Sequence, residues 1–514
     1  MNSHVKTSII LIIIGLLGIM LFKFLTPIFD DFQQQDTSDA KGIKGKIVIG
    51  YDNWVGYFPL CSPEMKKRMR QTGYLLECVD DNADYVDRYK KLSSGKYDFA
   101  VGTVDSYIIN GEKEDYPGVI TAVIDESKGG DAIVAWEDVI TSLDDLKTSN
   151  GLRIAYTPDS PSDHLLKAVS VHFDIPKTLQ PIEANGSNDA LDKLLAREVD
   201  VAILWEPAVS RAISKKGIKR IISTKDTNQL IVDILIANRK LSDRKPELVT
   251  IFLKQYFKTL KYYRDNEDVL IADIAKQTKV DKTSVKSLLN GVEWSTLTDN
   301  AQRWYGTSSA ALPQEALIDT IDSTVEILTG YGSVSSNPIP DGNPYRITNS
   351  EFIKKLYDEV SNTAFGSKAG AISADSLIKE FVPISDKAWN NLSEIGTLKV
   401  RPIIFASGTA SLTIEGKQQL DSAAENLKHY PNYRVEIHGH TGTRGDKKAN
   451  KTLSADRADS VKRYLAATFD VDVDRIRAIG FGAEKPLAKN SGESSRAYNY
   501  RLPRVELKLV AEEL

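Results

Sequence analysis

The chain has little cysteine and histidine and no strong bias of charge. Only two of its 514 residues are cysteines and six are histidines, so a disulfide-dense scaffold and a cysteine-rich zinc module are excluded. Lys and Arg number 66 against 70 Asp and Glu, which gives a net charge of -4 and no support for nucleic-acid binding through a basic surface. The hydrophobic share of 41% and charged share of 26% are those of a globular protein with room for roughly three domains of ~150 residues.

One local feature departs from this average, at the N-terminus. Ile9 to Phe22 contains no charged residue, and the apolar character resumes after Lys23. A membrane-spanning helix needs about 20 residues, and a lysine near its end can extend to the interface. A cleaved secretory signal is the alternative, but no small-x-small cleavage site follows closely. We therefore expect residues 1–30 to be an uncleaved transmembrane signal anchor and 31–45 to be a linker.

The flanking charges predict the orientation of this anchor. Lys6 precedes the apolar run, and Asp30 and Asp31 follow it. The positive-inside rule then places the N-terminus in the cytoplasm and the bulk of the chain in the periplasm, as a single-pass inner-membrane protein. That compartment permits oxidation, so Cys61 and Cys78 form either a disulfide, which we favour slightly, or two buried thiols.

The middle of the chain alternates short apolar runs with amphipathic helical stretches. This pattern predicts an α/β fold with parallel strands, in which ligands bind beyond the carboxyl ends of the strands. The strands expected are 46–51, 97–102, 132–136, 152–156, 199–205 and 220–223. The residues that directly follow four of them are the candidates for ligand contact: Trp54, Gly56, Tyr57, Thr103, Asp105, Ser160, Ser162, Trp205 and Glu206.

Five segments of this region occur in a characteristic order: YDNWVGYFPL, VGTVDSY, SKGGDAIVA, TPDSPSDHLL and LLAREVDVAILWEPAVSRA. Together they resemble the type II periplasmic solute-binding proteins, in the branch that serves nitrate, sulfonate and taurine-like uptake. The resemblance implies a solute-binding domain over 46–362, with two α/β lobes that close on a small ligand, and a possible ABC permease as partner. It does not identify the ligand.

The expected ligand contacts each have a structural alternative. Ser160 to Asp163 reads as a helix start, whose backbone N–H groups form an anion site, or Ser160 only caps the helix. Trp54 and Tyr57 form an aromatic wall or pack between the lobes. Glu206 is expected to be structural, and no Arg or Lys stands out, which favours a small polar or singly charged anionic ligand. The ligand-binding residues predicted are Trp54, Tyr57, Thr103, Ser160, Ser162 and Trp205.

The C-terminal segment has a βαβαββ pattern, after a linker over 363–395. Its first strand is expected at Leu398 to Phe405, and a helix at Leu453 to Leu465 with Ser454 as its N-cap. The motifs F-x-S-G-x-A-x-L, I-x-G-H-T, N-x-x-L-S-x-x-R-A and R-V-E resemble the OmpA-like domain, over 396–514. The resemblance implies an α+β fold that binds peptidoglycan.

In the resembled family, an Asp after G-H-T binds the ammonium of the stem peptide and the Arg of R-A binds its carboxylate. Arg457 is present here, but Gly442 stands where the Asp is expected. Loss of one partner of a charge-assisted pair costs ~1.5–3 kcal/mol, so weaker binding is expected. The peptidoglycan-binding residues predicted are Thr441, Asp446, Asn450 and Arg457, with Asp446 as the replacement acid.

The sequence therefore predicts an N-terminal transmembrane helix, a two-lobed periplasmic-binding fold and an OmpA-like domain. The function that this favours is an anchored solute-binding protein that also holds the cell wall. The alternative is an envelope scaffold or ligand sensor that feeds no transporter. An enzyme is not expected, since G-x-S-x-G and H-E-x-x-H are missing. We expect no catalytic residue, cofactor or metal.

Overall fold

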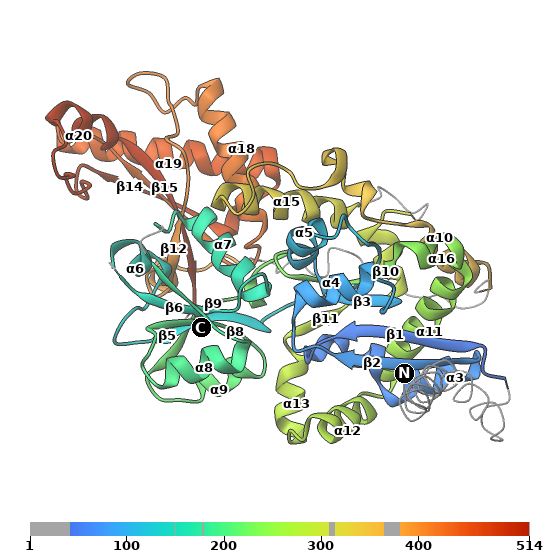
Figure 1. The fold of residues 1–514 in the computed structure, drawn as a ribbon. Coiled ribbons are helices and arrows are strands. Elements are labelled where there is room, and N and C mark those ends of the chain that lie inside the picture. The colour runs from blue at the N-terminus through green and yellow to red at the C-terminus, as the bar shows by residue number, and fades with distance from the viewer. Residues whose placement is uncertain (1–41, 150, 177–178, 308–313, 364–380, 513–514) are drawn as a thin grey trace, which may run out of the picture.

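The computed structural model describes residues 42–149, 151–176, 179–307, 314–363 and 381–512. The predicted anchor (1–30) and residues 31–41 of the predicted linker lie outside this part of the chain. No helix within these ranges combines the length and the apolar character that crossing a bilayer requires. Figure 1 shows three bodies, each built around one β-sheet: two lobes and a C-terminal domain.

The first lobe holds a six-stranded sheet in the order β11-β4-β10-β3-β1-β2. It is formed by two separate stretches of chain. The first contributes β1 (Gly45–Tyr51), α2 (Phe58–Cys61), α3 (Pro63–Gln71), β2 (Tyr74–Asp80), α4 (Tyr85–Ser93), β3 (Phe99–Thr103), α5 (Val104–Glu112) and β4 (Gly118–Ser127). The second contributes β10 (Val232–Asn238), α10 (Arg239–Arg244), α11 (Pro246–Asp265), α12 (Glu267–Thr278), α13 (Lys282–Leu289), β11 (Val292–Trp294), α14 (Leu297–Asp299), α15 (Ala316–Tyr331) and α16 (Glu351–Thr363).

The second lobe holds a five-stranded sheet in the order β7-β6-β8-β5-β9. Its elements come from a single stretch: β5 (Asp131–Trp136), α6 (Leu143–Thr148), β6 (Arg153–Tyr156), α7 (Pro161–Phe173), β7 (Gln180–Glu183), α8 (Ser187–Leu195), β8 (Val201–Trp205), α9 (Ala208–Ile213) and β9 (Ile218–Ser223). The chain crosses between the lobes from β4 to β5 and returns from β9 to β10. Helix α15 packs against α5 of the first lobe and α7 of the second, so it also spans the two.

The expectation of parallel strands is correct only in part. The pairs β1–β2, β1–β3, β6–β7 and β6–β8 are parallel. Strand β10 is antiparallel to β3 and β4, and β5 is antiparallel to β8 and β9. The reason is the double crossing, because a strand that enters or leaves a lobe at the crossing runs against the strands made by local βαβ units.

A disulfide joins Cys61 at the end of α2 to Cys78 on β2, with their Cα atoms 6.1 Å apart. It closes a loop across a sequence separation of 17 residues. The loop carries α3, whose Met65 and Met69 are fully buried in the core of the first lobe. The covalent bond and the apolar contacts therefore hold α3 against the edge of the sheet together.

The C-terminal domain has a four-stranded sheet in the order β12-β15-β13-β14. Its elements are α17 (Asp386–Asn390), β12 (Ser393–Leu398), α18 (Ile414–Lys428), β13 (Arg434–His440), α19 (Lys447–Phe469), β14 (Ile476–Gly482), α20 (Ser495–Arg501) and β15 (Arg504–Ala511). Strand β14 is parallel to β13, whereas β15 is antiparallel to both β12 and β13. The βαβαββ order is thus present, with the short helix α20 before the last strand.

Two boundaries predicted for this domain are wrong. The first strand is Ser393–Leu398, not Leu398 to Phe405, and Phe405 makes only an isolated bridge to Leu412. The helix expected at Leu453 begins at Lys447, with Asp446 as its N-cap. Ser454 lies inside this helix, where its hydroxyl donates to Lys451 O and accepts the N–H of Gly482. A serine that resembles a cap by sequence is used here to hold the helix against the end of β14.

The C-terminal domain packs directly on the second lobe, and the two share one hydrophobic core. Phe173 at the end of α7 contacts Tyr430, with ring centroids 5.3 Å apart. Main-chain and side-chain bonds surround this contact: Lys399 N donates to His172 O, and the Asp144 carboxylate accepts from Thr397. The domain is therefore fixed to one lobe by a buried interface and is not joined to it by the linker alone.

Candidate functional site

The residues predicted from the strand ends do gather where the lobes meet. Trp54 and Tyr57 follow β1, Thr103 is the last residue of β3, and Ser160 and Ser162 follow β6. All five are less than one-tenth exposed. Trp205, at the end of β8 in the second lobe, packs against the core of the first lobe. The carboxyl ends of strands from both lobes thus form one buried boundary.

Trp54 and Tyr57 each donate a hydrogen bond to a buried carboxylate at this boundary. Trp54 Nε1 donates to Asp125 Oδ1 over 3.1 Å, and the Tyr57 hydroxyl donates to Asp233 Oδ1. Asp125 and Asp233 lie directly opposite one another on β4 and β10. The two aromatic side chains therefore hold a pair of carboxylates, which sequence reasoning had not included in the site.

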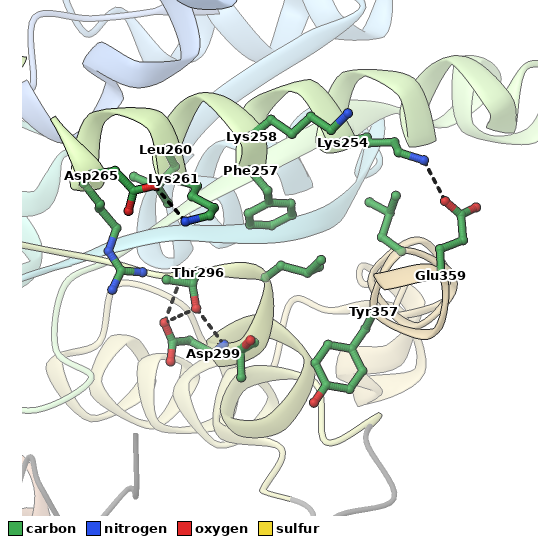
Figure 2. Close-up of a pocket in the computed structure, with 14 residues that line it drawn as sticks. Lys254, Phe257, Lys258, Leu260, Lys261, Asp265, Thr296, Asp299, Tyr357 and Glu359 are labelled. Carbon is green, nitrogen blue, oxygen red and sulfur yellow. Dashed lines mark hydrogen bonds and ion pairs between the residues drawn. The ribbon is translucent and has the colours of Figure 1, made fainter. Parts of the chain in front are cut away.

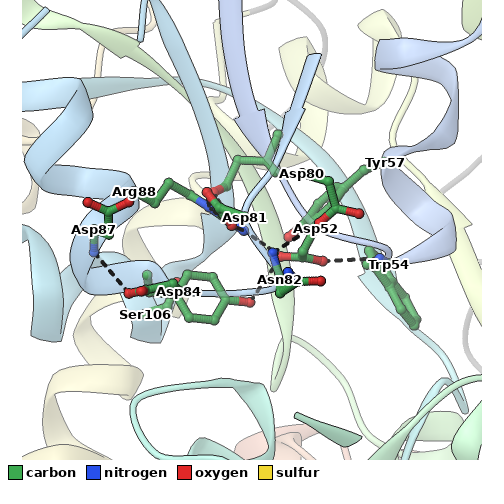
Figure 3. Close-up of polar contacts among 12 residues, drawn as sticks. Asp52, Trp54, Tyr57, Asp80, Asp81, Asn82, Asp84, Asp87, Arg88 and Ser106 are labelled. Carbon is green, nitrogen blue, oxygen red and sulfur yellow. Dashed lines mark hydrogen bonds and ion pairs between the residues drawn. The ribbon is translucent and has the colours of Figure 1, made fainter. Parts of the chain in front are cut away.

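A second buried acid cluster lies beside this pair and contains one cation. The Arg88 guanidinium is fully buried and pairs with both Asp52 and Asp81. Arg88 also donates to the Val101 carbonyl of β3 over 2.9 Å. Figure 3 shows these groups together, with Asp52 also accepting the backbone N–H of Trp54. Arg88 thereby fixes the loop after β1, which carries the aromatic residues.

Burial changes the proton affinity of these acids. It raises the pKa of Asp125 to about 7 and raises that of Asp233 well above its usual range. The charge of Asp125 adds to the shift of Asp233, whereas hydrogen bonds with Trp54 and Asp233 oppose the shift of Asp125. Burial also raises the pKa of Asp105 to about 6 and of Asp131 to about 7. The boundary between the lobes therefore carries several carboxyl groups that titrate near neutral pH.

Asp105 and Asp131 are the most informative of these acids for binding. Asp105 lies in the first turn of α5 in the first lobe, and Asp131 begins β5 in the second. Each is at least 97% buried, and each has one carboxylate oxygen without a hydrogen-bond partner among the described residues. Such oxygens are costly to bury. Their acceptor capacity is available to a donor placed between the lobes.

The polar side chains at the start of α7 bond to the loop before the helix and to the helix itself. Ser160 Oγ donates to Thr157 O over 2.6 Å, and Ser162 Oγ accepts the N–H of Thr157 over 2.9 Å. Asp163 pairs with Lys167 at 2.7 Å, one turn further along α7. The two serine hydroxyls therefore hold the loop between β6 and α7. The negative charge of Asp163 in the first turn of α7 disfavours the binding of an anion there. Glu206 is structural as expected, since it accepts from the backbone N–H and the hydroxyl of Ser210.

The two chain segments that cross between the lobes are hydrogen-bonded to each other through Thr224. Thr224 Oγ1 contacts Ser127 Oγ at 2.7 Å and accepts the N–H of Gly129 at 2.9 Å. Lys113, the residue directly after α5, pairs with Asp159 of the second lobe at 3.1 Å. The lobes are thus joined through both chain crossings and through an ion pair between loops.

The acids that sequence reasoning missed had a visible signal. Asp125 interrupts the apolar strand GVITAVIDES, and Asp233 interrupts VDILIAN. A charged residue inside an otherwise buried strand must find a partner or a role. Arg88 carried no such signal, because its helix shows ordinary charged positions and only the fold places it inside.

A separate hollow of about 500 Å³ lies on the first lobe, between α11, α16 and the turn at Thr296 to Asp299. Figure 2 shows its lysines along α11, with Lys254 paired to Glu359 at 2.8 Å and Lys261 to Asp265 at 2.7 Å. It shares no lining residue with the predicted ligand contacts. Four of its charged groups thus form two ion pairs with one another.

The residues predicted to bind the cell wall lie around the end of β13 and the start of α19. Thr441 follows β13 and is buried, with its hydroxyl unpartnered among the described residues. Asp446 caps α19 by accepting the N–H of Ala449, and Asn450 donates to Arg444 O. Arg457 donates to Thr409 O over 3.0 Å and lies over the Phe405 ring. A side chain at Gly442 would meet open space, so the missing Asp would fit.

Comparison with known proteins separates the chain into two matched segments. Residues 76–270 match the NMT1/THI5-like family model, and residues 404–500 match the OmpA family model. The E. coli periplasmic aliphatic sulphonate binding protein SsuA is 17% identical, with a TM-score of 0.45, covering 57% of this chain and 89% of its own.

Two curated relatives each match a segment of 100 to 120 residues of the chain. The outer membrane protein Omp38 of Acinetobacter baumannii is 35% identical over 100 residues, which is 20% of this chain and 28% of Omp38. The peptidoglycan-binding protein ArfA of Mycobacterium tuberculosis is 36% identical over 120 residues, which is 23% of this chain and 36% of ArfA. The chain thus spans about a third of the length of these relatives. With both segments matched, the chain carries an NMT1/THI5-like domain followed by an OmpA-family domain.

Proposed function

We propose that this chain is an extracytoplasmic solute-binding protein held to the cell wall by its OmpA-family domain. The observation that carries the proposal is the boundary between the lobes, where strand ends of both lobes bring buried, unpartnered carboxylate oxygens together. A matched wall-binding relative supports the second half of the role. Anchoring by residues 1–30 in the inner membrane, and delivery to an ABC permease, belong to the same proposal.

The charges at the boundary refine the expected ligand. Asp105 and Asp131 are both buried there, and burial raises the pKa of each. The nearest buried cations are already paired, Arg88 with Asp52 and Asp81 and Lys167 with Asp163. A ligand that donates hydrogen bonds, neutral or cationic, suits these acceptors better than an anion does. The proposed substrate class is therefore a small polar solute with amino or amide groups.

A thermal-shift screen of the full-length protein in detergent tests this function. The panel contains nitrate, sulfonates, taurine, amino acids and small amines. A ligand at a hundredfold excess over its Kd adds about 2.7 kcal/mol to stability, so one compound should raise the Tm clearly. Asp131→Asn should weaken that shift, whereas Asp138→Asn, an exposed acid of the same lobe, should leave it unchanged. A broad panel without any stabilising compound would sink the solute-binding proposal.

A second candidate function is a ligand sensor that feeds no transporter, and one contact favours it. The C-terminal domain touches the crossing segment directly: Asn228 N donates to His429 O over 2.8 Å, and His429 Nδ1 donates to Asn228 O over 3.1 Å. A change at the crossing would therefore reach the wall-binding domain. Sedimentation with purified cell wall, with and without the stabilising ligand, separates the two. A ligand-dependent change favours the sensor, and unchanged binding favours the tethered transporter component.

The location is tested independently of the ligand. Intact-mass analysis of the mature protein from the membrane fraction should show a chain that retains residues 1–30. A mature chain that starts near residue 40 would overturn the anchor. Wall binding alone would then hold the protein in the envelope.

A further inference from the structure

Two histidines and a glutamate meet on one face of the C-terminal sheet. His438 and His440 are two residues apart on β13, so both side chains point to the same face. Glu506 lies on the neighbouring strand β15, directly opposite His438. One ligand atom from each of the three residues lies within 4.8 Å of those of the other two. No other group of three such residues within the described ranges meets this condition.

His440 carries an independent sign of a missing partner. Its residue is 98% buried, and neither of its ring nitrogens has a hydrogen-bond partner among the described residues. The nearest acid atom, Glu506 Oε2, stands 3.5 Å from Nε2. A neutral imidazole has one N–H donor and one acceptor, and burying both without partners is costly. A cation bound at this ring would remove that cost.

The neighbouring side chains leave one carboxylate oxygen of Glu506 and one ring nitrogen of His438 for a metal ion. Arg504 binds Glu506 through Oε1, at 2.6 Å, which leaves Oε2 directed at His440. Glu436 Oε2 lies 2.8 Å from one ring nitrogen of His438. This carboxylate either orients the ring, as acids commonly do for metal-bound histidines, or supplies a fourth ligand. Phe481 stacks on His440, with ring centroids 5.4 Å apart, and holds it in place.

We propose that His438, His440 and Glu506 form a binding site for a divalent transition-metal ion of the zinc class. Two imidazoles and one carboxylate are the donor set that zinc accepts in sites with three protein ligands, and hard ions such as Mg²⁺ and Ca²⁺ prefer oxygen alone. The ion would link β13 to β15 beside Thr441, the first residue of the predicted wall-binding loop. The proposal does not depend on the solute between the lobes.

Metal titration of the tag-free, full-length protein in detergent tests the site. Cobalt(II) serves as the visible probe, and zinc competes with a chromophoric chelator. We expect one equivalent of cobalt to give the visible absorption of a low-coordinate site and one equivalent of zinc to displace it. His440→Ala and Glu506→Gln should each weaken zinc binding by more than the about 10- to 100-fold that loss of an outer partner costs.

The matched control is Glu394→Gln, which removes another acid of the same sheet that pairs with Lys508 outside the cluster. This variant should keep full zinc affinity. The wild-type cobalt spectrum needs no variant to fold, so it decides the case if His440→Ala is unstable. Wild-type protein without stoichiometric cobalt absorption, or cobalt bands that persist in Glu506→Gln, would overturn the proposal.

Discussion

His172 of the second lobe stacks on His429 of the C-terminal domain, with ring centroids 5.2 Å apart and ring planes 15° apart. His172 Nδ1 lies 2.7 Å from the Tyr430 hydroxyl, and His429 Nε2 lies 2.8 Å from Ser323 Oγ. His429 Nδ1 donates to the Asn228 carbonyl, and burial favours the neutral form of the ring. The contact between the two domains thus depends on two uncharged imidazoles.

This pair predicts a loss of stability in mild acid. Burial lowers the pKa of His172 well below its usual range, and burial lowers that of His429 also. Below about pH 6.5, the pKa of histidine in an unfolded chain, the two histidines bind protons in the unfolded state but stay neutral in the folded state. Stability is then full above that pH and falls below it, by at most about 1.4 kcal/mol per pH unit for His172.

Thermal unfolding between pH 7.5 and 5 measures this effect. His172→Gln should lower the Tm at pH 7.5, because it removes a packed ring, but it should flatten the decline below pH 6.5. Other groups titrate equally in both proteins, so the difference in slope is the readout. Parallel curves for the two proteins would show that the pair does not control acid stability.

Arg88→Met should destabilise the first lobe strongly. It leaves the buried Asp52 and Asp81 carboxylates without their cation, and breaking a buried pair in this way costs about 3–5 kcal/mol. Arg463→Met removes an exposed partner of Asp459 and should cost no more than about 1 kcal/mol. Denaturant unfolding of both variants gives the comparison. Equal losses would mean that the buried network contributes no more than a surface pair.

Gly130→Ala should disturb the boundary between the lobes. A Cβ at Gly130 would stand 2.2 Å from Cη2 of the Trp54 ring, and such overpacking costs typically about 1–3 kcal/mol. Trp54→Val should recover part of this loss in the double variant, since it restores the space. Gly442→Ala, which meets no atom within 4 Å, serves as the neutral control. Additive losses at Gly130 and Trp54 would refute the contact.

Gly442→Asp should strengthen binding to purified cell wall. It restores the acid at an open position beside the loop, and a charge-assisted bond of ~1.5–3 kcal/mol corresponds to about a ten- to hundredfold gain in affinity. Arg457→Ala should abolish sedimentation with the wall. If Arg457→Ala sediments like the wild type, the carried-over site is wrong although the fold is right.

Removal of the Cys61–Cys78 disulfide should cost about 3 kcal/mol, the stability that a loop of this length provides in the chain-entropy account. The Cys61→Ala/Cys78→Ala protein should melt earlier than the wild type under non-reducing conditions. Dithiothreitol should lower the Tm of the wild type alone. A wild type that does not respond to full reduction would show that packing of α3 makes the bond dispensable.

Local sequence patterns were enough to predict most helices and strands, and the strand ends at which the candidate ligand contacts lie. Trp54, Thr103, Ser160 and Trp205 were singled out because each stands at the end of an apolar strand, and all of them lie at or near the boundary between the lobes. Strand and helix periods depend on neighbouring residues in the chain. The family motifs likewise placed the OmpA-family domain, since they mark turns and helix starts.

What the sequence by itself determined is therefore most of the elements, the two domain types and the strand ends that surround the candidate site. Only the tertiary structure decided which groups meet. It set Asp125 opposite Asp233 from strands 108 positions apart, buried Arg88 between two acids, and brought Glu506 to His438 and His440. It also reversed β10 and fixed the C-terminal domain on the second lobe. The physical reason is that these contacts depend on how strands distant in the sequence pair and pack. Neither the local hydrophobic periodicity nor a short motif predicts that pairing.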